Sequence, residues 1–129
     1  MTGRYRGNRQ ALPALCLSSD ASALTCIAND WSYEDVFSRQ VEAFGKSEDV
    51  LIVFSTSGKS PNILKALEVA RQRKLLTLGA LGKGGGPAKN LCDHAIVVPS
   101  DDTSRIQEIH GWLIHAWLEC VEALAVGKS

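Results

Sequence analysis

Three short apolar runs, separated by stretches with helical periodicity, constrain the fold of this chain more than any other feature. They cover residues 49–55, 75–81 and 94–99, and each closes on small or turn-forming residues. Such runs are typical of strands that are buried on both faces of a parallel sheet. The sequence therefore predicts three strands, and a weaker fourth candidate covers residues 14–17.

Helical patterns lie before, between and after these runs. In residues 61–74, for example, Ile63, Leu64, Leu67 and Ala70 share one helical face. The predicted helices cover residues 22–28, 34–44, 61–74 and 103–126.

Strands that alternate with helices predict an α/β fold. We expect one domain, residues 1–129, with a doubly wound parallel sheet and helices on both of its faces. Ligands of such sheets bind beyond the carboxyl ends of the strands, where the loops gather.

The charge balance excludes a general polyanion binder. The chain carries 14 basic and 14 acidic residues, so it lacks the field that would attract nucleic acid or an anionic membrane. No stretch approaches the roughly 20 apolar residues of a membrane span. We therefore expect a cytoplasmic protein that binds neither nucleic acid nor membrane.

The cysteines are widely separated, show no Cys-x-x-Cys spacing and mostly lie in apolar runs. We interpret them as buried reduced thiols rather than as disulfides or zinc ligands. They are Cys16, Cys26, Cys92 and Cys120.

The segment Ser57-Gly58-Lys59-Ser60 matches the second half of a nucleotide-binding P-loop. A complete loop has another glycine five residues before the Gly-Lys-Ser, where the backbone begins to surround the phosphates. That position holds Val53, inside a predicted strand. We therefore expect no ATP or GTP and no nucleotide cofactor.

The same loop is rich in hydroxyl groups. Ser55, Thr56, Ser57 and Ser60 lie at a strand-to-helix turn, where Gly58 permits an unusual backbone angle. With Ser60 as N-cap and the free N–H groups of a helix start, the turn suits a phosphate monoester. Serines and threonines also cap helices and fill turns, so the local sequence leaves that alternative open.

A second glycine-rich turn covers residues 82–87. It does not fit the pattern G-x-G-x-x-G, because its sixth position is Pro87. We interpret it as a flexible surface loop without a ligand.

Three motifs together resemble the sugar isomerase (SIS) domain family: STSGKSPN, CIANDW with the following FSRQVEA, and RIQEIHGWLIHAWLE. Within it, the chain is most similar to the sedoheptulose 7-phosphate isomerases, also called phosphoheptose isomerases. The similarity runs from Thr2 to about Ala123. It implies an SIS-type fold, which is a flavodoxin-like three-layer sandwich.

The resemblance also implies an activity, namely the interconversion of sedoheptulose 7-phosphate and D-glycero-D-manno-heptose 7-phosphate, a step towards the heptose of bacterial lipopolysaccharide. Moving a carbonyl between neighbouring carbons passes through an enediol, so the site needs a proton-transfer group, and a metal can stabilise the oxyanion. The resemblance implies that family members are cytoplasmic homotetramers with active sites at subunit boundaries, and that many bind zinc. The implied partners are a phosphorylated heptose sugar and further copies of the chain, in a dimer or a tetramer.

The resemblance assigns roles to single residues. Gln107 would contact both substrate and metal, while His115 would be a metal ligand and the catalytic proton-transfer residue. The implied phosphate contacts are Ser55, Thr56, Ser57 and Ser60, and the implied sugar contacts are Asn29 and Asp30.

Several of these residues have structural alternatives. A lone histidine on a largely apolar helix, such as His115, is more often a hydrogen-bonded core residue. Its eight-residue separation from Gln107 is about 12 Å along an ideal helix axis, near the limit for sharing one ion. Asp30 could equally be a polar residue that ends a helix, and we interpret His110 as structural.

The chain departs from the family at its start. The family's N-terminal helical region, which carries an Asn-Gly-Ser turn and a His-x-x-x-Glu pair with further zinc and proton-transfer residues, has no counterpart here. Of the zinc ligands only Gln107 and His115 are present, so zinc is possible but we expect low affinity and impaired turnover unless another chain supplies the rest. Lys59 replaces the family's usual Asn and could strengthen phosphate binding or face water.

Two functions therefore remain open from the sequence. One is a phosphoheptose isomerase-like enzyme. The other is a non-catalytic SIS module that binds a sugar phosphate or a protein partner.

Overall fold

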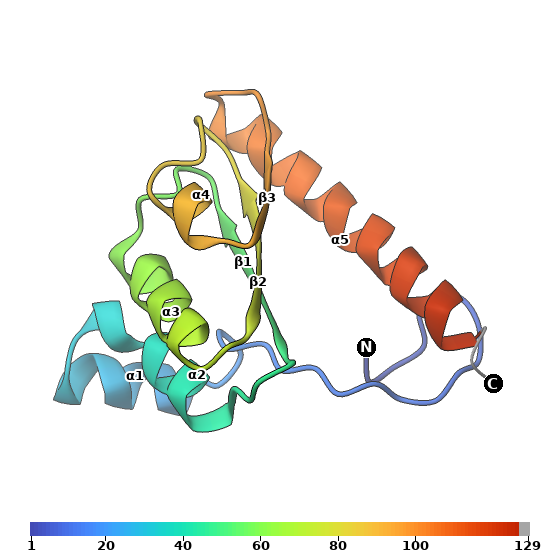
Figure 1. Cartoon of the computed structure of the whole chain (residues 1–129), viewed down its shortest axis with the longest axis horizontal. Helices are drawn as coiled ribbons and strands as arrows, with labels where there is room; N and C mark the ends of the chain where they lie inside the picture. Colours follow the sequence, from blue (N-terminus) through green and yellow to red (C-terminus); the bar gives the residue numbers. More distant parts are fainter. Residues whose placement is uncertain (127–129) are drawn as a thin grey trace.

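A sheet of three parallel strands forms the centre of the computed structural model, which describes residues 1–126 (Figure 1). The strands are β1 (Val50–Ser55), β2 (Leu76–Leu81) and β3 (His94–Val97), in the order β1-β2-β3. Ser55 pairs with Leu81 at the carboxyl ends of β1 and β2. The loops that follow these two strands therefore leave the sheet at neighbouring positions.

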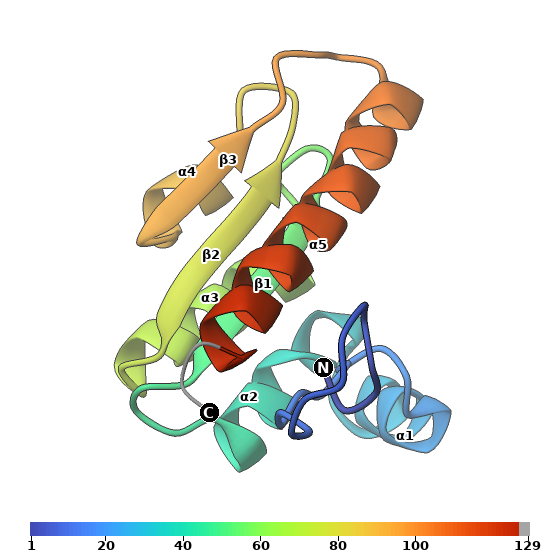
Figure 2. The ribbon, with the colours of Figure 1, turned by 90° about the vertical axis from the view of Figure 1, so that its right-hand side faces the viewer.

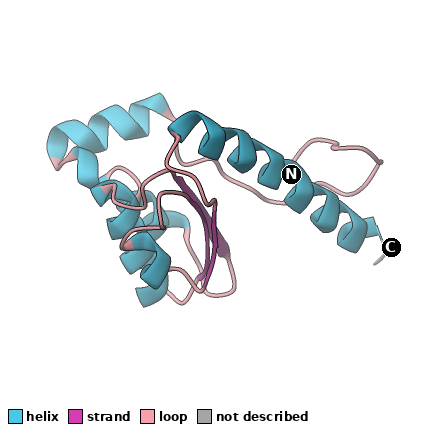
Figure 3. Ribbon diagram, turned by 90° about the horizontal axis from the view of Figure 1, so that it is seen from above, coloured by secondary structure: helices cyan, strands magenta, loops and turns pink. Residues whose placement is uncertain are grey.

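Helices cover both faces of the sheet (Figures 1 and 3). One long helix lies on one face, and the shorter helices lie on the other side. The predicted class, an α/β fold with a parallel sheet between helices, is confirmed. The helical elements are α1 (Ala21–Asp30), the 3₁₀ turn η1 (Tyr33–Asp35), α2 (Ser38–Phe44), α3 (Pro61–Gln72), α4 (Ala88–Leu91) and α5 (Thr103–Val126).

The main core lies between the sheet and α3. Alternate strand residues face α3, and Val53 and Leu81 pack there against Leu67 and Ala88. A second cluster joins α2 to α3 through Val41, Ala66, Ala70 and Leu75. Removing these apolar side chains from water is the main favourable contribution to folding on this face.

The end of α3 is a Schellman motif, which sets the direction in which the chain enters β2. The Leu75 N–H donates to the Ala70 carbonyl at 2.9 Å, and the Lys74 N–H donates to the Arg71 carbonyl at 3.1 Å. Leu75 and Ala70 also belong to one apolar cluster, as is common in this motif. Lys74 occupies the left-handed position, with φ 62°, where glycine is usual.

The N-terminal segment is attached to the far end of α5 (Figure 2). The backbone N–H groups of Arg6 and Gly7 donate to the Glu122 carboxylate at 3.1 Å, and Arg9 lies 3.4 Å from it. Burial opposes the ionisation of Glu122, but these N–H groups and the Arg9 charge outweigh it and lower its pKa. The carboxylate therefore connects two segments that are distant in sequence.

Two of the predicted elements are corrected by the structure. Residues 14–17 do not form a strand; instead the Leu17 carbonyl accepts a hydrogen bond from the Gln40 side chain at 2.9 Å. The predicted helix 34–44 is divided into η1 and α2, because the chain turns at Val36 to bury that side chain completely. The other predicted strands and helices are present, with ends that differ by a few residues.

The cysteines are all free thiols, but the predicted burial is wrong for three of them. Cys16, Cys26 and Cys120 are exposed and Cys92 is half-buried. Apolar neighbours in sequence misled the prediction, because Cys26 and Cys120 lie on outward faces of α1 and α5. No helix within residues 1–126 is both long and apolar enough to cross a membrane.

Lys74→Gly should stabilise the protein by about 0.5–1 kcal/mol, because the cost of a left-handed non-glycine residue, roughly 1–2 kcal/mol, exceeds the added chain entropy of glycine. Arg73→Gly is the matched control: Arg73 has φ −87° and donates to the Gly45 carbonyl at 3.0 Å, so this variant should be destabilised. Urea unfolding measures both. Equal destabilisation of the two variants would contradict the claim that the left-handed backbone of Lys74 is strained.

The thiols should differ in reactivity, because the thiolate is the nucleophile. The Ser18 hydroxyl lowers the pKa of Cys16, whereas Asp30 raises the pKa of Cys26 and burial raises that of Cys92. Near neutral pH, iodoacetamide should therefore label Cys16 before Cys26 and Cys92, as followed by peptide mass spectrometry. Labelling of Cys26 as fast as Cys16 would refute the predicted order.

Candidate functional site

The loop at residues 55–60 is shaped by its own hydroxyl groups. The Gly58 N–H donates to the buried Ser55 Oγ at 3.0 Å, and the Lys59 N–H donates to the Ser57 Oγ at 3.2 Å. Gly58 has φ 63°, as the sequence predicted for an unusual turn. Both hydroxyls accept bonds within the loop, and each has an O–H group that can also donate.

Ser60 occupies the N-cap position of α3, as predicted, with Pro61 at the first helical position. Its carbonyl accepts from the N–H groups of Ile63 and Leu64 at 3.0 and 3.1 Å. Its side chain, however, makes no capping hydrogen bond. The Ser60 hydroxyl is therefore available to a ligand at the start of a twelve-residue helix, where the dipole favours an anion.

A pocket of about 330 Å³ lies between this loop and α5. It brings together two of the residues singled out by the sequence, Thr56 and Gln107. Phe54 forms part of the wall, and its ring centroid lies 5.8 Å from that of His110. The remaining lining residues are Gly111 and Ile114. A ligand whose phosphate rests on the loop could extend its other end towards Gln107.

His110 is the buried histidine of α5. It is 6% exposed, and its Nε2 atom has no hydrogen-bond partner within residues 1–126. A buried polar atom without a partner is costly. The structural role that the sequence predicts for His110 stays a prediction, since its side chain is buried but also lines the pocket.

His115 is not a core histidine, which was the structural alternative left open by the sequence. It is exposed on α5, and its Nδ1 atom lies 3.4 Å from the Tyr5 hydroxyl oxygen. The pocket that Gln107 lines does not include His115. The structure therefore does not bring His115, the predicted proton-transfer residue, to the pocket beside the loop at residues 55–60 within one chain.

Asn29 and Asp30 are exposed at the end of α1. The Asn29 side-chain amide donates to the Asp30 carboxylate at 2.8 Å, and the Cys26 thiol lies 3.5 Å from the same carboxylate. Neither residue lines the pocket beside Thr56. The structure therefore does not bring these two predicted sugar-binding residues to the pocket beside the loop at residues 55–60.

The residues present do not fit a zinc ion by themselves. Within residues 1–126, no group of three or more His, Cys, Asp or Glu side chains is placed to hold a metal. A structural or catalytic zinc site uses at least three protein ligands, and Gln107 and His115 supply two at most.

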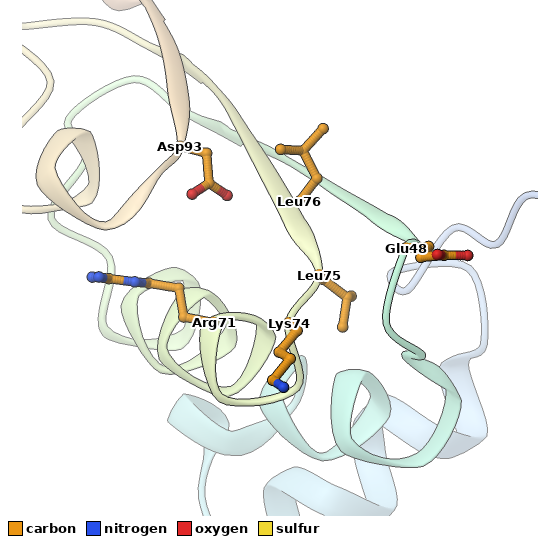
Figure 4. Close-up of a pocket in the computed structure, with 6 residues that line it drawn as sticks. All are labelled: Glu48, Arg71, Lys74, Leu75, Leu76 and Asp93. Carbon is orange, nitrogen blue, oxygen red and sulfur yellow. The ribbon is translucent and has the colours of Figure 1, made fainter.

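A larger pocket, of about 410 Å³, lies at the other end of the sheet (Figure 4). No sequence motif indicated it, because its charged residues come from separate loops and from α3. The hydroxyl and the backbone N–H of Thr77 donate hydrogen bonds to the Asp93 carboxylate and lower its pKa. Asp93 therefore has a structural role in this pocket. Its lining is Glu48, Arg71, Lys74, Leu75, Leu76 and Asp93.

Comparison with known proteins identifies the family. Residues 1–82 match the SIS domain family. The chain is 54% identical over 122 residues to phosphoheptose isomerase 1 of Campylobacter jejuni, covering 95% of this chain and 66% of that protein. It is 56% identical over 129 residues to the phosphoheptose isomerase of Helicobacter pylori strain Shi470, covering 100% of this chain and 67% of the relative.

Solved structures give the same result. A phosphoheptose isomerase from Neisseria gonorrhoeae superposes with a TM-score of 0.81 at 41% identity, over 83% of this chain and 61% of that one. The chain thus spans about two thirds of the length of the curated relatives it matches. On these grounds, the chain belongs to the SIS domain family and is homologous to the phosphoheptose isomerases.

Proposed function

We propose that this chain forms the phosphate-binding core of a phosphoheptose isomerase that interconverts sedoheptulose 7-phosphate and D-glycero-D-manno-heptose 7-phosphate. The observation that carries the proposal is the hydroxyl-rich loop at residues 55–60, whose Thr56 lines the same pocket as Gln107. Relatives that are more than half identical to the chain bear this enzyme's name. The reaction would belong to the cytoplasm and to the synthesis of lipopolysaccharide heptose.

In this proposal the loop holds the phosphate. The hydroxyls of Ser55, Thr56, Ser57 and Ser60 donate to its oxygens, and the start of α3 adds a favourable dipole. Lys59 is exposed in the same loop, where its charge would add to the attraction. The sugar extends along the pocket towards Gln107, and Asn29 and Asp30 would reach it only through a rearrangement or from another copy.

His115 is the proposed proton-transfer group. An imidazole can both accept and donate a proton near neutral pH. It can therefore take a proton from the sugar carbon next to the carbonyl, which forms the enediol, and return it to the former carbonyl carbon. Because His115 lies outside the pocket of its own chain, we propose that it acts in a homo-oligomer. Exposed apolar side chains on the same helix support this: Ile109, Trp112 and Ile114 are 43%, 65% and 41% exposed.

No step of the proposed reaction is assigned to zinc. Gln107 and His115 are the proposed metal contacts, but an ion bound to them would need further ligands from outside residues 1–126. The alternative function, a non-catalytic module that binds a sugar phosphate, is favoured by the separation of His115 from the pocket.

Inorganic phosphate is expected to raise the melting temperature of the chain, because it binds the folded state. Ser60→Ala should weaken phosphate binding about tenfold, since hydrogen bonds to charged groups are worth about 1.5–3 kcal/mol. Ser22→Ala, on the exposed side of α1, is the control and should bind normally. Calorimetric titration measures both; equal affinities would argue against the loop as the phosphate site.

A coupled assay with sedoheptulose 7-phosphate tests the reaction itself. His115→Ala should lower turnover about 10²–10⁴-fold, the usual contribution of a proton-transfer group, without weakening phosphate binding. The exposed His94 of β3 provides the control variant, His94→Ala, which should keep its activity. Unchanged turnover in His115→Ala would reject its role, and phosphate binding without any wild-type turnover would favour the non-catalytic module.

A further inference from the structure

The glycine-rich loop at residues 82–87 is not the flexible surface loop that the sequence indicated. Gly82 and Gly85 are buried, and the loop contains four consecutive residues with left-handed φ angles, from Lys83 to Gly86. The Gly85 N–H closes it by donating to the Gly82 carbonyl at 2.9 Å, and the Lys83 N–H donates to the Ser100 carbonyl at 3.2 Å. The conformation is thus specific, and glycine is needed to reach it.

This loop lies directly against the loop at residues 55–60. A methyl group on Gly86 would lie 2.6 Å from the Ser57 carbonyl oxygen and 2.8 Å from that of Gly58. A methyl group on Gly58 would collide with the Gly85 carbonyl. The Ala88 N–H, at the start of α4, also donates to the Gly58 carbonyl at 3.1 Å. The two backbones are therefore in contact over Ser57 and Gly58, with no side chain between them.

We infer that the loop at residues 82–87 is a positioning element, which holds the loop at residues 55–60 in its phosphate-binding conformation, and that Gly86 permits the contact. The inference rests on the proposed phosphate site. Its physical basis is preorganisation: a loop fixed before binding does not lose conformational freedom when the ligand arrives. The glycine-rich loop need not touch the phosphate to affect its affinity.

The chain offers a matched pair of variants. Gly84 and Gly86 both have left-handed φ angles, 78° and 52°, so alanine is strained at either position. A methyl group on Gly84, however, meets nothing within 4 Å. Gly84→Ala therefore reproduces the backbone strain of Gly86→Ala without the collision with Ser57 and Gly58.

The test measures backbone amide resonances and phosphate affinity in both variants. Gly86→Ala should shift the amide resonances of Ser57, Gly58 and Lys59 and weaken binding of inorganic phosphate about tenfold or more. Gly84→Ala should leave those resonances in place and affinity within about twofold. Shifts confined to residues 82–89 in Gly86→Ala, or equal losses in both variants, would overturn the inference.

If the wild-type chain does not bind phosphate, the proposed function fails, while the amide shifts still decide whether one loop positions the other. If Gly86→Ala does not fold, hydrogen exchange in the wild-type chain decides: bound phosphate should slow exchange of the Ala88 amide, and an unchanged rate would overturn the inference.

Discussion

The parallel pairing of β1 with β2 is the interaction on which the candidate site depends. Because Ser55 and Leu81 are partners at the carboxyl ends of these strands, the loops that follow them begin next to each other. Their contact then requires glycine at Gly58 and Gly86, where any side chain would strike the opposite backbone. Sheet register, loop contact and the start of α3 meet at this turn, where the Gly58 and Lys59 N–H groups bond to the Ser55 and Ser57 hydroxyls.

The two faces of the sheet are covered unequally, and this bears on how the site is completed. On the α3 face, the clusters around Leu67 and Val41 exclude water from the strands. On the other face α5 packs closely only in part, and Figure 1 shows it diverging from the sheet towards its end. Ile52 and Leu76 remain 42% and 45% exposed there. In the proposed homo-oligomer, another chain would cover the exposed apolar residues on this face and lie near His115.

Much of the fold could be predicted from the sequence, because its signals are local. The apolar runs indicate β1 to β3, and Ser60-Pro61 indicates the start of α3. Residues 14–17 were wrongly assigned, because an apolar run does not reveal that the Leu17 carbonyl will bond to Gln40. The thiols of Cys26 and Cys120 were assigned to the core for a similar reason, since apolar neighbours do not tell which helix face points outward.

The candidate site was predictable in its chemistry but not in its assembly. The hydroxyl-rich turn is visible in the sequence. Its contact with residues 82–87 is a tertiary contact, and no sequence motif predicts it. The exposure of His115 was equally invisible, because it depends on how α5 leaves the sheet.

A crystal structure of the chain with bound sedoheptulose 7-phosphate is the most direct measurement of where the ligand lies. The predicted result is a phosphate group within hydrogen-bond distance of the Thr56 and Ser60 hydroxyls, with the sugar directed towards Gln107. A phosphate group bound instead at Arg71 and Lys74, with the loop at residues 55–60 empty, would contradict the assignment of the site.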